Sequence, residues 1–289
     1  MSSRLIARLT FRRPPPVVAV IRLTGVIGQG GFMRGGLNLE SVAPSLERAF
    51  RLPGVEAIAL SINSPGGSPA QSALIQRRIR DLAMEREVPV MAFVEDVAAS
   101  GGYWLACAAD EIFINDNSIV GSIGVISAGF GFTDALEKLG IERRLHAMGS
   151  KKSLLDPFKP ERPEDVARLV NVQRQIHENF KDLVRSRRGQ RLSLDEEELF
   201  SGDFWLGARA VEIGLADGIG DIRGVLRERY GKKVRMRTVG RRPSWLRRRF
   251  GFGAAGAMGA AFISEDGGGL VDNILASVEA RAWWSRFGL

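Results

Sequence analysis

Residues 97–104 read Val97-Ala98-Ala99-Ser100-Gly101-Gly102-Tyr103-Trp104. They follow an apolar run that predicts a buried strand over Val88–Val94, and they lead into a helix predicted over Tyr103–Ala109. A sharp strand-to-helix turn exposes its side chain beside the first backbone N–H groups of the helix. A carbonyl group bound there would meet the Ser100 hydroxyl and donors for its developing negative charge. Ala-Ser-Gly-Gly is also typical of an ordinary helix start. The case for Ser100 as a nucleophile therefore depends on the rest of the chain.

A second glycine loop follows another predicted strand. Val55–Ile62 is apolar enough for a buried strand, and Asn63-Ser64-Pro65-Gly66-Gly67 comes directly after it. Helices predicted over Leu39–Phe50 and Ser68–Glu87 alternate with the strands. This order predicts an α/β fold with a parallel sheet and helices on its faces. The loops that follow both strands would then share one edge of the sheet, where ligands bind in such folds.

The remaining elements are predicted from the same periodicities. The apolar spacing from Val166 to Val184 predicts a long helix with one buried face. Further strands are expected at Val17–Leu23, Glu111–Asn115, Ile119–Ser127, Ile141–Met148 and Lys233–Val239. Further helices are expected at Asp134–Leu139, Arg162–Arg188, Leu194–Phe200, Leu206–Ile213 and Ile222–Tyr230.

Charge and composition divide the 289 residues into a body and two basic ends. The hydrophobic fraction of 45% and the charged fraction of 26% are ordinary for a globular protein, and the net charge is +8. We expect a basic leader at 1–16, one domain at 17–239, and a basic, Gly/Ala-rich extension at 240–289 that ends in an amphipathic helix. The basic ends favour binding to anionic lipid, or they serve only to keep the protein soluble. No nucleic-acid motif accompanies them, so no nucleic-acid partner is expected.

The chain has few residues for metal binding or histidine-dependent catalysis. It contains one cysteine, Cys107, which is predicted to be a small buried residue and not a catalytic thiol. The chain has two histidines, His146 and His177, and one cysteine, so neither a metal site nor a cofactor is expected. If Ser100 is a nucleophile, a lysine must therefore be considered as its general base.

Four motifs together resemble the signal peptide peptidase A (protease IV) family of serine peptidases. They are Asn63–Gly67, Ala99–Tyr103, Gly121-Ser122-Ile123-Gly124-Val125, and the lysine-bearing loop Gly149–Pro157. The similarity covers roughly residues 17–238, with the motifs in the family's order. It implies a Clp protease/crotonase-like fold of repeated ββα units with helices around parallel sheets.

The resemblance also implies a Ser–Lys dyad. Ser100 matches the nucleophile, Lys152 matches the general base with Lys151 as the alternative, and Ser122 matches the serine that hydrogen-bonds the lysine. A lysine accepts a proton only when it is neutral, and apolar surroundings favour that form. The residues that match the oxyanion hole and the substrate-binding turn are Gly66 or Gly67 with the N–H of Ser100, and Gly101.

For the whole protein, the resemblance implies an endopeptidase acting on peptides such as remnant signal peptides, through an acyl-enzyme. It implies a homo-oligomer, an octameric ring or dome, whose sites are shared between subunits. Typical family members carry a membrane anchor before the domain, and this sequence shows no apolar run of about 18 residues. We therefore expect a cytoplasmic protein or one attached peripherally to the cytoplasmic membrane. The alternatives are a crotonase-like acyl-CoA enzyme and a non-catalytic membrane scaffold.

Overall fold

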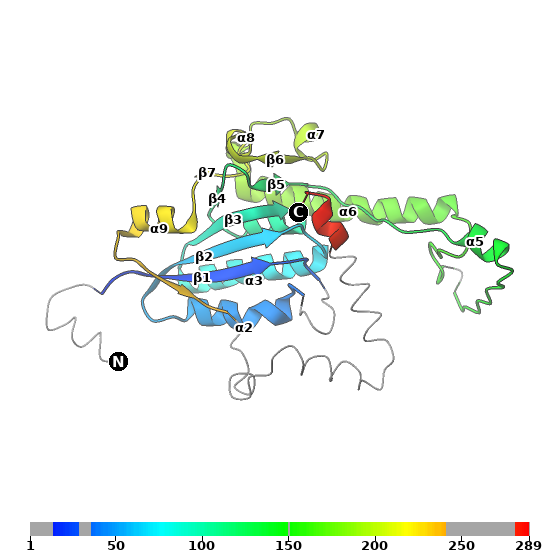
Figure 1. The fold of residues 1–289 in the computed structure, drawn as a ribbon, viewed down its shortest axis with the longest axis horizontal. Coiled ribbons are helices and arrows are strands. Elements are labelled where there is room, and N and C mark those ends of the chain that lie inside the picture. The colour runs from blue at the N-terminus through cyan, green and yellow to red at the C-terminus, as the bar shows by residue number, and fades with distance from the viewer. Residues whose placement is uncertain (1–13, 29–35, 150, 241–280, 289) are drawn as a thin grey trace.

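A computed structural model describes residues 14–28, 36–149, 151–240 and 281–288. The body is an α/β fold built on one eight-stranded sheet, so the predicted fold class is confirmed (Figure 1). Its path runs β6-β5-β3-β2-β1-β8, and β4 joins β3 to β7. All pairings are parallel except that of β5 with β6. The strands are β1 (Val17–Thr24), β2 (Val55–Ser64), β3 (Val90–Ala99), β4 (Glu111–Ile114), β5 (Ile119–Gly121), β6 (Phe204–Leu206), β7 (Gly218–Ile219) and β8 (Arg235–Thr238).

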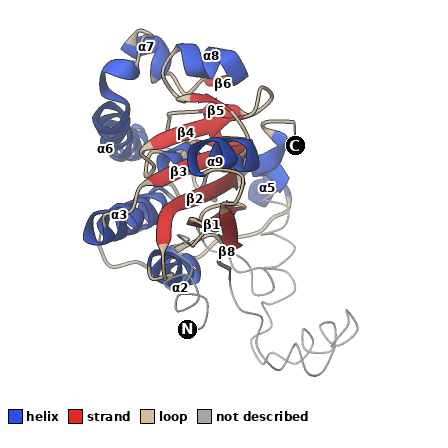
Figure 2. Ribbon diagram, turned by 90° about the vertical axis from the view of Figure 1, so that its left-hand side faces the viewer, coloured by secondary structure: helices blue, strands red, loops and turns tan. Residues whose placement is uncertain are grey.

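Helices cover both faces of the sheet (Figure 2). The main core lies between one face and α2, α3 and α4, whereas α9 packs its Leu226 on the other face against β1, β2 and β3. Because the central strands are covered on both sides, they are apolar along almost their whole length. The helices are α2 (Leu39–Phe50), α3 (Pro69–Arg86), α4 (Gly101–Ala106), α5 (Thr133–Lys138), α6 (Pro163–Arg188), α7 (Glu196–Leu199), α8 (Gly207–Glu212) and α9 (Ile222–Tyr230).

Three strand predictions need correction. β3 continues five residues beyond Val94, because Val97–Ala99 pair with β5 after an irregularity in the pairing with β2. At that irregularity the exposed Glu95 and Asp96 accept hydrogen bonds from the side chains of Ser61 and Asn63. The strand predicted over Ile119–Ser127 ends at Gly121, which has a φ of 109°. The strand predicted over Ile141–Met148 is absent, and this segment is exposed without strand pairing. The short strands β6 and β7 were not predicted.

The prediction of a buried face along the whole of α6 is wrong for its first half. Phe180 and Val184 are buried in the body, and the Phe180 ring stacks on Trp104 of α4 with centroids 4.7 Å apart. Val166, Val170 and Val172 are instead 36–48% exposed. The first half of α6 projects from the body, and the chain that carries α5 lies at its far end (Figure 1). We call residues 125–149 and 151–162, with the first half of α6, the arm.

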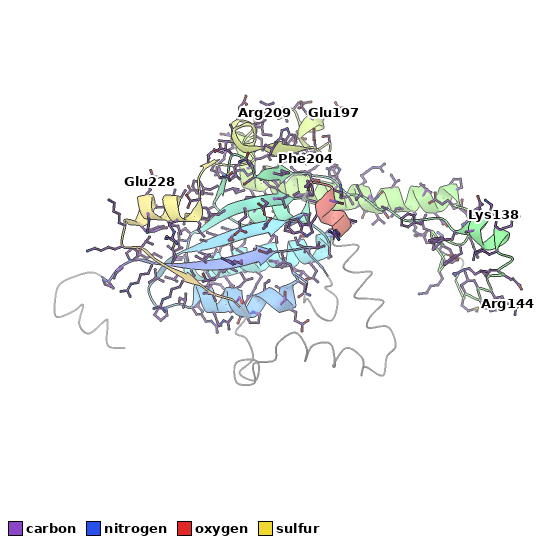
Figure 3. All side chains as sticks on the ribbon, in the orientation of Figure 1. Lys138, Arg144, Glu197, Phe204, Arg209 and Glu228 are labelled. Atoms are coloured by element: carbon purple, nitrogen blue, oxygen red, sulfur yellow. The ribbon has the colours of Figure 1, made fainter. Side chains whose placement is uncertain are left out.

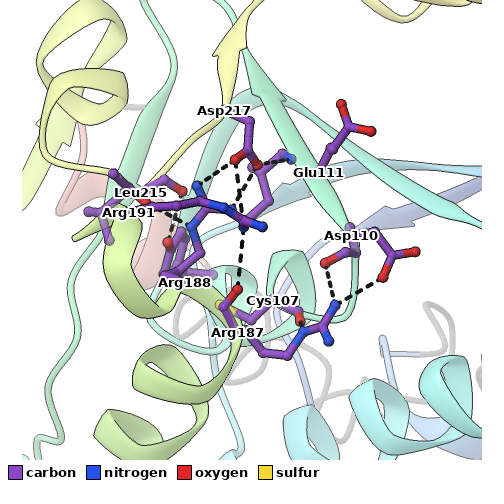
Figure 4. Close-up of polar contacts among 12 residues, drawn as sticks. Cys107, Asp110, Glu111, Arg187, Arg188, Arg191, Leu215 and Asp217 are labelled. Carbon is purple, nitrogen blue, oxygen red and sulfur yellow. Dashed lines mark hydrogen bonds and ion pairs between the residues drawn. The ribbon is translucent and has the colours of Figure 1, made fainter.

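The second half of α6 is fixed to the body by a buried ionic network (Figure 4). The Arg188 side chain is 1% exposed and donates to both carboxylate oxygens of Asp217, at 2.7 and 3.0 Å, and to the Gly214 carbonyl. Asp217 also accepts the Ile112 N–H, and the buried Tyr103 hydroxyl donates to the Leu215 carbonyl. The network thereby joins α6 to β4 and to the loop that holds Tyr103 of α4.

Replacing Arg188 by alanine is expected to destabilise the protein by about 3–5 kcal/mol, because Asp217 would be left as a largely buried charge without its main partner. Arg191→Ala is the matched control. Its guanidinium lies 3.6 Å from the same carboxylate but is 50% exposed, so we expect a loss of about 0–1 kcal/mol. Urea denaturation at one fixed protein concentration measures both values. Equal losses for the two variants would show that burial does not give this ion pair its importance.

Most of the predicted basic ends lies outside the described residues, namely 1–13, 241–280 and 289. The amphipathic helix predicted at the carboxyl end is described only over 281–288. There the Phe287 ring contacts Phe204 of β6 edge-on, with centroids 5.7 Å apart, so this part packs on the protein's own body. Among the described residues, no helix combines the length and apolarity that crossing a bilayer demands.

Candidate active site

Ser100 occupies a strained turn between β3 and α4. Its φ of 51° and ψ of −121° are unusual for a residue with a side chain, and such strain concentrates at functional sites. Among the described residues, four besides glycine have positive φ: Glu87, Ser100, Ser122 and Leu155. Three of these four belong to motifs that the sequence singled out. The strand-to-helix turn predicted at Ser100 is therefore confirmed, with α4 starting two residues earlier than predicted.

The loop that follows β2 lies directly against the Ser100 turn. A Cβ atom built on Gly66 would lie 2.9 Å from the Cβ of Ser100 and 3.0 Å from the backbone nitrogen of Gly101. The two glycine loops therefore meet at one edge of the sheet, as the sequence predicts. Contact this close is possible only because residue 66 has no side chain, and its φ of 108° also favours glycine.

The segment around Ile27 holds Gly66 and Gly67 in place. Ile27 N–H donates to the Gly66 carbonyl, and its own carbonyl accepts the Ser68 N–H, both at 2.7 Å. The only sequence signal for this role is the glycine-rich run that begins at Gly25. With its carbonyl held by Ile27, the Gly66–Gly67 peptide is fixed beside Ser100.

Backbone donors are available at this edge. The N–H groups of Gly67 and Gly101 have no hydrogen-bond partner within the described part of the chain. The N–H of Ser100 instead donates to the Gly121 carbonyl at 2.8 Å, and that of Gly66 meets the Ser64 hydroxyl at 3.2 Å. Among the described residues, Gly67 and Gly101 therefore have free N–H donors, whereas the Ser100 N–H, which the resemblance assigns to the oxyanion hole, is engaged with Gly121.

The third motif also reaches the Ser100 turn. The bond from Ser100 to the Gly121 carbonyl places Ser122, the next residue, close by, and Ser122 is 8% exposed with a φ of 50°. Its N–H donates to the carbonyl of Asp203, the residue that precedes β6, at 2.6 Å. Gly121 itself packs on the Trp205 ring. Three of the four motifs are thus brought together.

The lysine loop is not brought together with them within one chain. Lys151 and Lys152 are both exposed, and they lie on the arm, which Figure 3 shows extending to Lys138 and Arg144 away from the sheet. The arm also exposes large apolar side chains: Phe130 is 82% exposed, Leu139 71% and Met148 95%. A single chain therefore presents the serine and the candidate base at separate places.

Other residues able to act as nucleophile or base are engaged elsewhere. Burial raises the pKa of the Cys107 thiol to about 12, so it stays protonated at neutral pH, as expected for a small buried residue. The His177 ring pairs with the Ile123 carbonyl at 3.0 Å, and no described contact joins it to Ser100. The described residues hold no cluster of His, Cys, Asp and Glu side chains suited to a metal ion.

Gly66→Ala is expected to reduce activity at this site by at least about 100-fold, because the added methyl group would displace Ser100. Gly25→Ala is the matched control. Gly25 has almost the same φ, 107° against 108°, but among the described residues nothing lies within 4 Å of an added Cβ. Both variants should lose about 1–3 kcal/mol of stability from backbone strain. Equal activities in the two variants would contradict a role for this contact.

Comparison with known proteins now identifies the family. The model of peptidase family S49 matches residues 83–234, which contain the Ser100 turn, the Ser122 motif and the lysine loop. The chain belongs to peptidase family S49. The resemblance to signal peptide peptidase A is thereby confirmed at the level of the family.

Relatives of this S49 chain carry two kinds of name. Protease 4 of Haemophilus influenzae is 30% identical over 223 residues, which are 75% of this chain and 35% of that protein. A Brucella abortus protein named Na(+)/H(+) antiporter NhaA is 48% identical over 289 residues, 99% of this chain and 39% of that protein. The chain thus spans well under half the length of these relatives. Among solved structures, a ClpP1 mutant from Listeria monocytogenes gives a TM-score of 0.45 at 16% identity, covering 72% of this chain and 94% of that one.

Proposed function

We propose that this S49 chain is a serine endopeptidase that works through a Ser100–Lys152 dyad. The observation that carries the proposal is the meeting of the two glycine loops, which sets Gly66 directly against the strained Ser100. The N–H groups of the adjoining Gly67 and Gly101 have no hydrogen-bond partner among the described residues. Donors fixed around a developing oxyanion stabilise the transition state of acyl transfer. Membership of the family supports serine peptidase chemistry at this turn.

In the proposed reaction, the Ser100 Oγ attacks the carbonyl carbon of the scissile peptide bond while its proton passes to the neutral Lys152 amine. The carbonyl oxygen becomes an oxyanion bound by the N–H groups of Gly67 and Gly101. The tetrahedral intermediate then expels the amine, which takes the proton from Lys152, and leaves an ester on Ser100. Water attacks the ester with the same lysine as base, and the acid product leaves as Ser100 regains its proton. Ser122 would hold the lysine amine through its hydroxyl.

We further propose that Lys152 serves the Ser100 of a second copy, within a homo-oligomer for which we favour an octameric ring or dome. Two features of the arm support this assembly: it exposes Lys152 away from the sheet, and it exposes Phe130, Leu139 and Met148. Exposed apolar surface of this kind marks an interface. Cover from a second copy would also place the lysine among apolar groups, where its neutral form is favoured.

The proposed substrates are peptides, such as remnant signal peptides or other membrane-associated or cytoplasmic polypeptides. The proposed location is the cytoplasm or the cytoplasmic membrane surface, reached through the basic ends of the chain. Liposome flotation of the protein with and without residues 240–289 tests this attachment. Equal flotation of both forms would remove the carboxyl end from the proposal.

A fluorophosphonate activity probe tests the nucleophile. We expect one adduct, mapped by mass spectrometry to Ser100, and loss of peptide hydrolysis in proportion to labelling. Peptide hydrolysis that continues after complete labelling of Ser100 would overturn the proposal. Thioester hydrolysis by Ser100→Ala would favour an acyl-CoA enzyme, and absence of any labelling would favour a scaffold.

A further inference from the structure

The described residues of the lysine loop, 151–157, are anchored by one side chain from the preceding segment. Arg143 donates from Nη2 to the Asp156 carboxylate at 3.0 Å, and the Asp156 side chain is only 4% exposed. The other Asp156 oxygen accepts the Phe158 N–H at 3.1 Å. Asp156 therefore links the end of the lysine loop to Arg143 on one side and to its own backbone on the other.

Aromatic packing completes the anchor. The Arg143 guanidinium lies 4.7 Å from the centroid of the Phe158 ring, and that ring stacks on Phe132 at 5.5 Å. Phe132 also donates its N–H to the Pro157 carbonyl at 2.7 Å. A planar guanidinium can stack on a ring and bind a carboxylate at the same time, which an ammonium group cannot do as well.

The described polar and ring contacts of Arg143 lie within the arm. Its described polar and ring contacts are with Asp156 and Phe158, and no described hydrogen bond, ion pair or ring contact joins it to the sheet or to the core. Its neighbour Arg144 differs: that side chain is 76% exposed and pairs with the equally exposed Glu142. Of two adjacent arginines, one is paired with the lysine loop, whereas the described ion pair of the other is with Glu142.

We propose that Arg143 is a positioning residue, which holds the lysine loop in the shape that brings Lys152 to the Ser100 of a second copy. This inference rests on the proposed function. If Arg143 acts in this way, it matters only in the subunit that supplies the lysine. In the subunit that supplies the serine, its own loop is directed to a different site.

Mixed assemblies test this dependence. Ser100→Ala chains and Lys152→Ala chains, co-expressed with different tags and purified through both, should form about a quarter of their sites from one intact serine and one intact lysine. Arg143→Ala is then added either to the Ser100→Ala chain, which supplies the lysine, or to the Lys152→Ala chain, which supplies the serine. Arg144→Ala is placed in the same two positions as the matched control.

We expect Arg143→Ala to lower kcat by about 10- to 100-fold in the lysine-supplying chain, with KM and the sedimentation profile unchanged. In the serine-supplying chain it should have no effect, and Arg144→Ala should have none in either. Arg143→Lys, which keeps the charge but not the planar group, should restore part of the loss. Equal losses in both arrangements, or a changed sedimentation profile, would overturn the inference.

The premise is tested by the same samples. An active wild type with an inactive mixture of Ser100→Ala and Lys152→Ala chains would refute the shared site, and with it the role of Arg143. A wild type that hydrolyses no peptide would refute the proposed function itself. These two failures are distinct from an active mixture in which Arg143→Ala acts equally from either chain.

Discussion

Replacing Ser100 by alanine is expected to abolish peptide hydrolysis, with kcat falling by at least about 10⁴-fold. The variant retains the glycine loops and their donors but has no oxygen to form the acyl-enzyme. Since the side chain is small and only partly buried, the fold and the assembly should persist. Steady-state kinetics on a fluorogenic peptide measures the rate, and sedimentation velocity measures the assembly.

Ser72→Ala is the control for this change. Ser72 is fully buried, and its hydroxyl donates to the Ser68 carbonyl of its own chain segment. A Cβ atom built on Gly101 would approach that hydroxyl, so Ser72 is a close neighbour of the site. Its substitution should leave kcat within about threefold of wild type, because it removes a hydroxyl with no part in the reaction. Wild-type turnover by Ser100→Ala would refute the proposed role of Ser100 as the nucleophile.

The second large effect is expected for Lys152→Ala, with a loss in kcat of at least about 10³-fold. Without a base, the Ser100 hydroxyl keeps its proton and is a poor nucleophile. Lys151→Ala is a closely matched control, because Lys151 is the adjacent residue, carries the same charge and is also exposed. Its kcat should stay within a few-fold of wild type. Peptide turnover of both variants is measured at the same degree of assembly.

The activities of the Lys151→Ala and Lys152→Ala variants together identify the general base. Loss in Lys151→Ala with retention in Lys152→Ala would move the base to Lys151 and keep the mechanism. Retention in both variants would refute a lysine base in this loop. In the Lys152→Ala chain, the oxyanion donors of the other motifs remain, so fluorophosphonate labelling of Ser100 should slow without disappearing.

Much of the body could be predicted from the sequence, because its elements satisfy local rules. Val17–Leu23 and Val55–Ile62 are apolar runs of strand length, and parallel strands covered on both faces need such runs. Leu39–Phe50 is preceded by Asn38, whose side chain caps the helix by accepting the Ser41 N–H. The meeting of the loops at Gly66 and Ser100 followed from topology alone, since parallel strands bring their carboxyl ends to one edge.

The remaining parts depend on contacts that local patterns do not encode. Glu95 and Asp96 look like the end of a strand, yet the pairing of Val97–Ala99 with β5 extends β3 beyond them. Residues 141–148 alternate in the manner of an edge strand, but no strand in the described part of the chain pairs with them. The apolar residues at the start of α6 follow the same spacing as its buried ones and stay exposed in the single chain.

The 26-residue helix α6 connects the two halves of the proposed chemistry. Its carboxyl end is fixed to the body by Phe180 and Arg188, and its amino end follows the loop that bears Lys152 in the chain. Each residue added to a helix lengthens it by about 1.5 Å and rotates whatever it carries by about 100°. In the proposed assembly, the number of residues between these two ends would therefore set both how far Lys152 reaches and the direction from which it meets a neighbouring copy.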